Sequence, residues 1–321
     1  MGRCCIALFL VFAAAGYPGQ DEPYREPVPA PPDVNLTIRA VGGAAVFQIG
    51  ERIELELLFT STVRDRYVVL LGSGGSVLGG SEPVTVAPRV GWEHPRGDFD
   101  QLCPVIIAMS SLGSTQALSV EPVVTTLELN DLVRFKDPGE YQISVQSQSA
   151  FTAKTKTPLI LNSNQLQITI LAATEQWQEQ TLRNAVAVLD GTGSFADLSW
   201  PQSNARWRAV DTLRYLGTPA AAREMVRWLK SDDLTSSAAV LRGLVASPAR
   251  EPVLDQMKAL LVDPDFKVDD HFLCAISYVA LGPDRSAQTK DQLQALAANF
   301  RNQLRSALKT KRGNREHEDD Q

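Results

Sequence analysis

The densest group of chemically versatile side chains in this chain lies in the segment RVGWEHPRGDFDQL, residues 89–102. It brings together an indole, an imidazole, a guanidinium and several carboxylates: Trp92, Glu93, His94, Arg96, Asp98 and Asp100. Such a mixture can recognise a ligand, because loops on a rigid scaffold commonly carry binding residues. Acid–base or metal chemistry would also need a paired ligand or an orienting partner, and the spacing offers neither. We therefore predict binding residues at Trp92, His94, Arg96 and Asp98; the alternative is a solvated loop anchored by its Trp.

A second polar group, DPDFKVDDH at residues 263–271, contains four aspartates and a histidine. Its spacing lacks the central Gly and the late Glu of an EF-hand loop, and it holds no His pair for zinc. Acidic residues ahead of a helix stabilise the start of that helix through its dipole. We expect helix capping here, with weak metal binding as the alternative, and we predict no metal site and no cofactor.

Motifs of known catalytic classes do not occur in the sequence. There is no Gly-x-Ser-x-Gly elbow, no His-Glu-x-x-His pair, and no Gly-Lys-Ser/Thr after the glycine-rich segment 72–83. The three histidines, His94, His271 and His317, provide few general bases near neutral pH. The sequence disfavours an enzyme, although catalytic residues can lie far apart along a chain.

Composition excludes some partners. The chain has 321 residues, 44% of them hydrophobic, which is enough for two domains with separate cores. Its formal net charge of −6 argues against binding to nucleic acid or anionic lipid, since such partners require a concentrated basic surface. A protein or peptide is the partner class that we expect.

The N-terminus predicts export to the periplasm or the extracellular space. In MGRCCIALFLVFAAAG, Arg3 precedes an apolar run that ends in small residues, as in a cleaved signal peptide of residues 1–15. The run is too short to span a bilayer comfortably, so we expect no membrane insertion after its removal. The other interpretation is a buried N-terminal helix. Residues 16–33 are rich in proline and predict a stiff linker.

Cysteine usage fits a chain without a disulfide framework. Cleavage of the leader would remove Cys4 and Cys5 and leave Cys103 and Cys274 in different predicted domains. We expect two buried thiols or at most one bridge.

The elements that must position these residues change period near residue 172. Before it, apolar residues alternate with polar ones, as in the strands around Ile53–Phe59 and Tyr141–Val145. Short strands separated by Gly, Pro, Ser and Asn over residues 34–171 predict an antiparallel β-sandwich. The segment DPGEYQISV places a Pro-Gly turn just before Tyr141, which predicts a hydrogen bond from the phenol back to nearby backbone.

After residue 172 the apolar spacing is that of α-helices, for example Leu182, Ala185, Val186 and Leu189. In LRYLGTPAAAREMVRWLKSDD, a Gly-Thr-Pro break separates two such runs. The same order of helix, short break and helix occurs twice more, less regularly. Residues 172–308 therefore predict helical hairpins, either stacked as a solenoid or closed into a bundle. Residues 309–321 are charged at almost every other position and predict a disordered tail.

Two stretches carry a family resemblance. Residues 137–145 with the strand SNQLQITIL at 163–171 resemble the last two strands of bacterial immunoglobulin-like or fibronectin-like modules. Residues 204–300 resemble the HEAT-like or armadillo-like repeat family. Together they imply a two-domain fold, all-β and then all-α, in a bacterial exported protein.

For function, this architecture favours a non-enzymatic interaction or scaffold module of the cell envelope that holds a protein or peptide. The polar side of the first hairpin adds binding candidates in a basic row that stands out on an acidic protein: Arg214, Arg223 and Arg227, with Glu224 and Lys230. The alternative is an exported enzyme or enzyme accessory with a site near residues 89–102. A polysaccharide-binding module is a third hypothesis, for which 7% aromatic residues provide little material.

Overall fold

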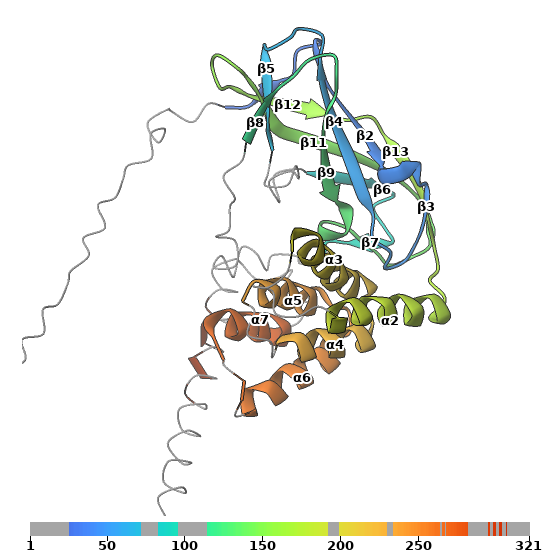
Figure 1. Ribbon diagram of the computed structural model, residues 1–321, viewed down its shortest axis with the longest axis vertical. Helices are drawn as coiled ribbons and strands as arrows, with labels where there is room; N and C mark the ends of the chain where they lie inside the picture. Colours follow the sequence, from blue (N-terminus) through green and yellow to red (C-terminus); the bar gives the residue numbers. More distant parts are fainter. Residues whose placement is uncertain are drawn as a thin grey trace, which may run out of the picture.

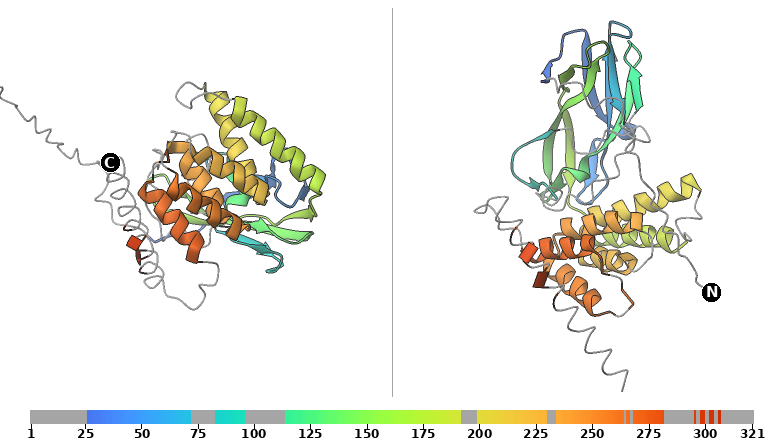
Figure 2. Two further views of the ribbon diagram at one scale, coloured as in Figure 1. Left: turned by 90° about the horizontal axis from the view of Figure 1, so that it is seen from below. Right: turned by 90° about the vertical axis from the view of Figure 1, so that its left-hand side faces the viewer.

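A computed structural model describes residues 26–71, 83–95, 114–191, 199–229, 234–263, 265–266 and 268–281, with 295, 298–299, 302–303 and 306. In these residues a sheet-rich N-terminal region is followed by six α-helices. The sheets lie at one end of the molecule and the helices at the other (Figure 1). The right-hand view of Figure 2 shows the same separation from another side.

The long strand β11 (Gly139–Thr152) organises the larger of the sheets. Its first part pairs with β13 (Leu166–Leu171) and β6 (Val84–Ala87). Its last part pairs with β12 (Pro158–Asn162) and β5 (Tyr67–Leu71). The strands β1 (Val28–Pro29), β3 (Val46–Gln48) and β8 (Ser114–Ala117) complete the sheet.

The sequence predicts antiparallel strands, but the two edge strands of this sheet run parallel to their neighbours. Strand β1 runs parallel to β12, and β3 runs parallel to β13. Both strands reach the sheet by long connections, which permit parallel pairing where a tight hairpin would not. The pairing of β1 also places residues 28–29 in the sheet, although the sequence assigned them to the proline-rich linker.

A second sheet has three antiparallel strands, β2 (Val34–Ala40), β4 (Glu54–Ser61) and β9 (Val123–Glu128). Every other residue of β2 and β4 is buried, so one face of this sheet covers a core. Leu36 and Leu57 from this face belong to one apolar cluster with Ile143 and Ile170 of the larger sheet. After β9 the chain forms a short 3₁₀ turn, η4 (Leu129–Asp131).

Tyr141 begins the buried face of β11 and makes the backbone hydrogen bond that the sequence predicts. Its hydroxyl donates to the carbonyl oxygen of Asp137 at 2.9 Å and lies 3.2 Å from that of Gly91. Gly91 has a φ of +84°, and a Cβ there would lie 2.2 Å from the Tyr141 hydroxyl. The phenol therefore ties the start of β11 to the segment that carries β7 (Trp92–Glu93) and its partner β10 (Arg134–Phe135).

The helices alternate between two layers (Figures 1 and 2). One layer contains α3 (Trp200–Leu216), α5 (Leu234–Ala246) and α7 (Asp270–Leu281), packed in series. The other contains α2 (Glu175–Gly191), α4 (Pro219–Leu229) and α6 (Arg250–Val262). Their facing sides form a second apolar cluster, separate from that of the sheets.

The Gly-Thr-Pro break of the sequence forms the turn between α3 and α4. Gly217 ends α3 in the left-handed conformation, with φ +62°. The Thr218 hydroxyl accepts a hydrogen bond from the Ala221 amide at 3.1 Å, and α4 begins at Pro219. At the start of α7, the Asp269 carboxylate accepts the Phe272 amide at 2.7 Å, which confirms the capping interpretation at that residue.

Candidate functional site

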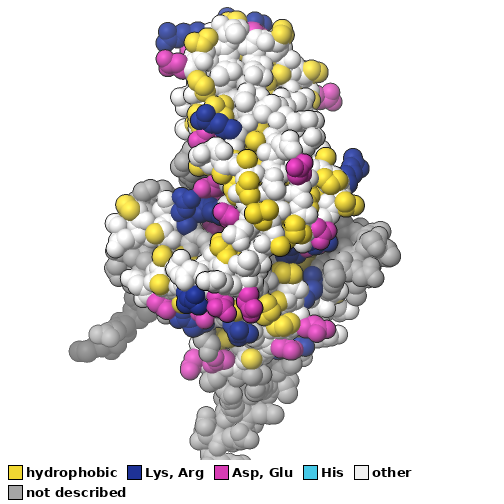
Figure 3. Space-filling view, turned by 90° about the vertical axis from the view of Figure 1, so that its right-hand side faces the viewer, with side chains coloured by type: hydrophobic (Ala, Val, Ile, Leu, Met, Phe, Trp, Pro, Cys, Tyr) yellow, Lys and Arg dark blue, Asp and Glu magenta, His cyan; other side chains and the backbone are white. Residues whose placement is uncertain are grey.

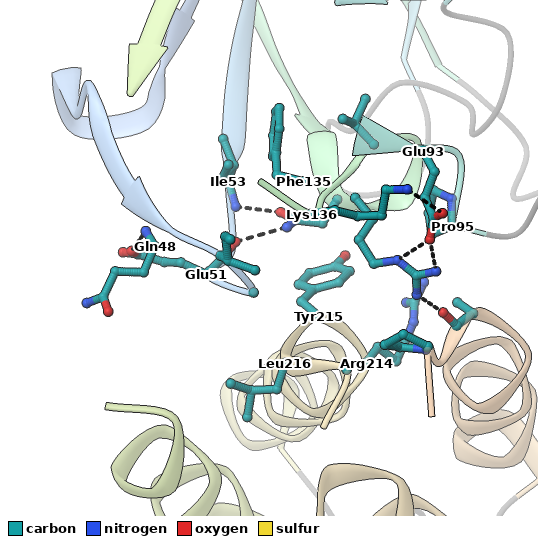
Figure 4. Close-up of a pocket in the computed structure, with 18 residues that line it drawn as sticks. Gln48, Glu51, Ile53, Glu93, Pro95, Phe135, Lys136, Arg214, Tyr215 and Leu216 are labelled. Atoms are coloured by element: carbon teal, nitrogen blue, oxygen red, sulfur yellow. Dashed lines mark hydrogen bonds and ion pairs between the residues drawn. The ribbon is translucent and has the colours of Figure 1, made fainter. Parts of the chain in front are cut away.

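A cavity of about 260 Å³ lies between the sheets and the helices (Figure 4). The sheet side contributes the turn between β3 and β4, the pair β7 and β10, and the end of η4. The helix side contributes the last residues of α3 and the end of α5 with the loop after it. The cavity thus exists only because the two parts of the chain are docked on each other.

Apolar side chains form most of its wall. They come from both parts of the chain: Ile49, Ile53, Val133, Phe135, Leu216 and Ala246. Most of these residues also belong to, or pack against, one of the two apolar cores. The wall is therefore held in place by the same packing that stabilises each part.

Arg134 on β10 bridges the two parts beside this wall. Its Nε donates to Glu93 Oε1 at 2.9 Å, its Nη2 also contacts that oxygen, and its Nη1 donates to the backbone carbonyl of Ala246 at the end of α5. Lys136 Nζ lies 3.5 Å from the other oxygen of Glu93. Burial raises the pKa of Glu93, but the hydrogen bonds and charges of Arg134 and Lys136 lower it by more, so this carboxylate is ionised at neutral pH.

A second bridge is formed by the end of α3. Arg214 Nη2 lies 2.6 Å from Asp131 Oδ1 of η4, and its Nη1 lies 2.6 Å from Asp211 Oδ1 one turn earlier on α3. The hydroxyl of Tyr215 donates to Asp131 at 3.2 Å. Burial opposes the charge of Arg214, but the two aspartates raise its pKa overall. Burial and Asp131 raise the pKa of Tyr215, so both groups keep their protons.

A third set of ion pairs joins α3 to the three-stranded sheet. Arg208 Nη2 of α3 lies 2.7 Å from Glu54 Oε2 of β4. Arg52 Nη2 lies 3.0 Å from the other oxygen of Glu54, and Arg52 Nε donates to Glu128 of β9 at 2.9 Å. One helix thus carries two separate polar contacts to the sheet side.

Backbone also meets backbone at this junction. Gly50, in the turn between β3 and β4, has a φ of +85°. A Cβ on it would lie 3.1 Å from the carbonyl oxygen of Tyr215 and 3.2 Å from Leu216 Cα. Gly50 therefore permits both the turn and the close approach of α3.

The residues predicted in segment 89–102 are only partly described. Trp92 packs against the core of the sheets, and its Nε1 donates to the Pro88 carbonyl at 2.9 Å, so its indole is a structural anchor. Its neighbour Glu93 lines the cavity, whereas Trp92 and His94 are not among the lining residues. Arg96, Asp98 and Asp100 lie outside the described residues.

The predicted basic row divides between two environments. Arg214 is only 9% exposed and belongs to the junction, whereas Arg227 is 49% exposed. Arg227 pairs with Glu224 at 2.7 Å and with Asp190 at 2.9 Å, and Arg223 is exposed on the same helix. Neither lines the cavity. On the face shown in Figure 3, basic and acidic side chains are interspersed over the helices, as expected for a surface of such pairs.

The sequence singles out some of the residues that line the cavity, but not all of them. Arg214, Tyr215 and Leu216 stand directly before the Gly-Thr-Pro break, and Glu93 lies in the polar segment. No local pattern indicated that Arg134 would meet them, because its partners lie 41 and 112 residues away along the chain. The feature that distinguishes this junction is the buried Arg214 at the end of α3.

In the described part of the chain, no group of three or more His, Cys, Asp or Glu residues is arranged to hold a metal ion. Within the same residues, none of the helices is long and apolar enough to cross a membrane. Comparisons of the chain with protein-family models, with curated proteins and with solved structures gave no match.

Proposed function

We propose that this protein is an exported, non-enzymatic binding or scaffold module that holds a protein or peptide partner at the cavity between its two parts. The observation that carries this proposal is an apolar cavity whose wall comes from both parts of the chain. Binding sites commonly lie at domain junctions and combine an apolar wall with a few polar groups. The surrounding sheets and helices then act as the scaffold that holds the wall in one shape.

Binding is favoured over catalysis because the charged groups beside the cavity already have partners. Glu93 is held by Arg134 and Lys136, and Arg214 is held by two aspartates. The phenol of Tyr215 donates to Asp131, and its raised pKa keeps it protonated. A general base needs a free lone pair directed at the substrate, whereas Glu93 accepts from Arg134, and Asp131 accepts from Arg214 and Tyr215.

For the fold, we propose an immunoglobulin-like or fibronectin-like sandwich followed by HEAT-like hairpins. The bond from the Tyr141 hydroxyl to the Asp137 carbonyl supports the first assignment, because a tyrosine corner closes on backbone a few residues upstream. The alternation of α3, α5 and α7 with α2, α4 and α6 supports the second, since stacked hairpins place every other helix in one layer.

Export to the periplasm or the extracellular space is part of the same proposal. Cys274 is disulfide-bonded, and disulfides persist in oxidising compartments. Removal of the predicted leader would take Cys4 and Cys5 away and leave Cys103, outside the described residues, as the other cysteine of the mature chain. Peptide mapping of the exported protein without reductant tests this: a linked pair of peptides carrying both cysteines supports export, and two free thiols contradict it.

The binding proposal is tested by a photo-crosslinking amino acid placed at the cavity in the native host. Lys136 suits the purpose because it lines the cavity, is 52% exposed and is held to Glu93 by a loose ion pair of 3.5 Å. The matched position is Lys154, an exposed lysine in the turn after β11 that does not line the cavity.

The expected result is one defined adduct from position 136 that is missing from position 154. The adduct should fall when the cavity is filled by Ala246→Leu. An exported enzyme remains the competing function, because Glu93 and Pro95 of the segment 89–102 line the cavity. Turnover of a substrate by the purified protein, without an adduct at position 136, would decide for the enzyme.

A further inference from the structure

We infer that the cavity receives a single uncharged aromatic side chain of the partner. This inference rests on the proposed function and adds the chemistry of the bound group. Three properties of the cavity lead to it: its size, the side chains that form its wall, and the state of the charges around it.

The size of the cavity suits one side chain. Sites for small molecules and cofactors typically enclose roughly 300–1,000 Å³. The cavity, at about 260 Å³, lies just below that range. A pocket of this size at an interface is filled by one large anchor residue, which then contributes most of the binding free energy.

The wall favours an aromatic anchor. Phe135 of β10 and Tyr215 of α3 both line the cavity, one from each part of the chain, and Figure 4 shows Phe135 above Tyr215. Aromatic rings gain from edge or offset contacts with other rings beyond the area that they bury. Ile53 and Leu216 add further apolar surface to the wall. An aromatic ring inserted there contacts both parts of the protein.

The charges beside the wall disfavour a buried ionised group. Arg134 and the half-exposed Lys136 share the one carboxylate of Glu93, and Arg214 lies between Asp131 and Asp211. A buried carboxylate or ammonium on the ligand would have to break one of these pairs or remain unpaired in an apolar wall. Either choice costs more than the burial of a neutral ring.

The test uses isolated side chains as probes on the intact two-part protein. The probes are N-acetyl-tryptophanamide, N-acetyl-phenylalaninamide, N-acetyl-leucinamide and the ionised N-acetyl-glutamate amide. Binding is followed by the methyl NMR signals of isoleucines. Ile49 and Ile53 line the cavity, whereas Ile168 is buried in the core of the sheets and serves as the internal control.

Two aromatic probes should shift the signals of Ile49 and Ile53 with dissociation constants on the order of millimolar, as expected for a single anchor. The leucine probe should bind more weakly, and the glutamate probe should not bind. Ala246→Leu fills the cavity and should weaken aromatic binding by roughly tenfold or more. Ala187→Leu makes the same change on the exposed side of α2 and should leave binding unchanged.

If Ala246→Leu does not fold, Ile49→Ala replaces it, because it removes wall surface instead of adding volume. Equal binding of the glutamate probe overturns the inference, and so does aromatic binding that moves Ile168 but neither cavity isoleucine. A crosslinked partner at position 136 together with silent aromatic probes refutes the aromatic anchor alone. Absence of both the adduct and the probe shifts refutes the proposed function as well.

Discussion

Replacement of Gly50 by alanine should separate the docking of the two parts from the stability of either part. Gly50 and Gly42 both have positive φ, +85° and +69°, so an alanine at either position pays the left-handed backbone cost of roughly 1–2 kcal/mol. Around Gly42 a Cβ meets nothing within 4 Å. At Gly50 it meets the carbonyl oxygen of Tyr215 at 3.1 Å and Leu216 Cα at 3.2 Å.

Those two atoms are backbone at the end of α3, so no side-chain rotation relieves the contact. The helix must shift away from the turn, at an added cost of about 1–3 kcal/mol by comparison with overpacked cores. Urea unfolding is followed for both variants by far-ultraviolet circular dichroism, which reports mainly on the helices, and by the methyl NMR signal of Ile143 in the core of the sheets. Gly50→Ala should lose about 1–3 kcal/mol more than Gly42→Ala, and its two signals should separate as the parts unfold independently. Equal losses with coincident transitions would refute the view that this approach holds the parts together.

Three other predictions concern the contacts of Tyr141, Arg214 and Glu93. Tyr141→Phe should lower the free energy of unfolding by roughly 1 kcal/mol in urea titrations, because the Asp137 carbonyl loses its hydrogen bond, and an unchanged midpoint would argue against that bond. Arg214→Leu should cost roughly 3–5 kcal/mol by removing the buried cation between Asp131 and Asp211, whereas Arg227→Leu on the exposed surface should cost about 0–1 kcal/mol; comparable losses would contradict the assigned burial. The pKa of Glu93 is lowered in the folded protein, so its stabilisation is complete above the unfolded pKa of about 4.3 and is lost as pH falls through the folded value. With Glu93→Gln, the free energy of unfolding should therefore fall less steeply as the pH is lowered below about 4.3. An identical pH dependence in both proteins would show that the pairing of Glu93 with Arg134 does not contribute.

Local signals in the sequence predict the elements well, because each rests on short-range chemistry. The change of period near residue 172 separates the last strand, which ends at Leu171, from α2, which begins at Glu175. The Gly-Thr-Pro break forms the turn between α3 and α4 for the reasons of backbone freedom, capping and fixed φ that make it recognisable. The Asp269 carboxylate caps α7 by accepting a backbone amide, as the Thr218 hydroxyl does for α4.

The cavity could not be predicted, because it depends on which face of one element meets another. Arg214 reads as one member of a basic row with Arg223 and Arg227, and helical spacing alone gives no reason to separate them. The difference comes from η4, which places Asp131 opposite the end of α3 and buries Arg214 there. The parallel edges at β1 and β3 were missed for a related reason, since strand direction at an edge is set by long connections.

The distribution of charge at the junction bears directly on how the cavity would bind. Arg208, Arg134 and Arg214 each reach from one part of the chain to the other, and Arg134 and Arg214 also line the cavity. Contacts of this kind add little net stability, and we expect them to specify one geometry, because a displaced arginine loses its partner across the junction. A wall that is fixed before the partner arrives requires little ordering on association. The same arginines that keep charge out of the cavity thereby reduce the cost of filling it.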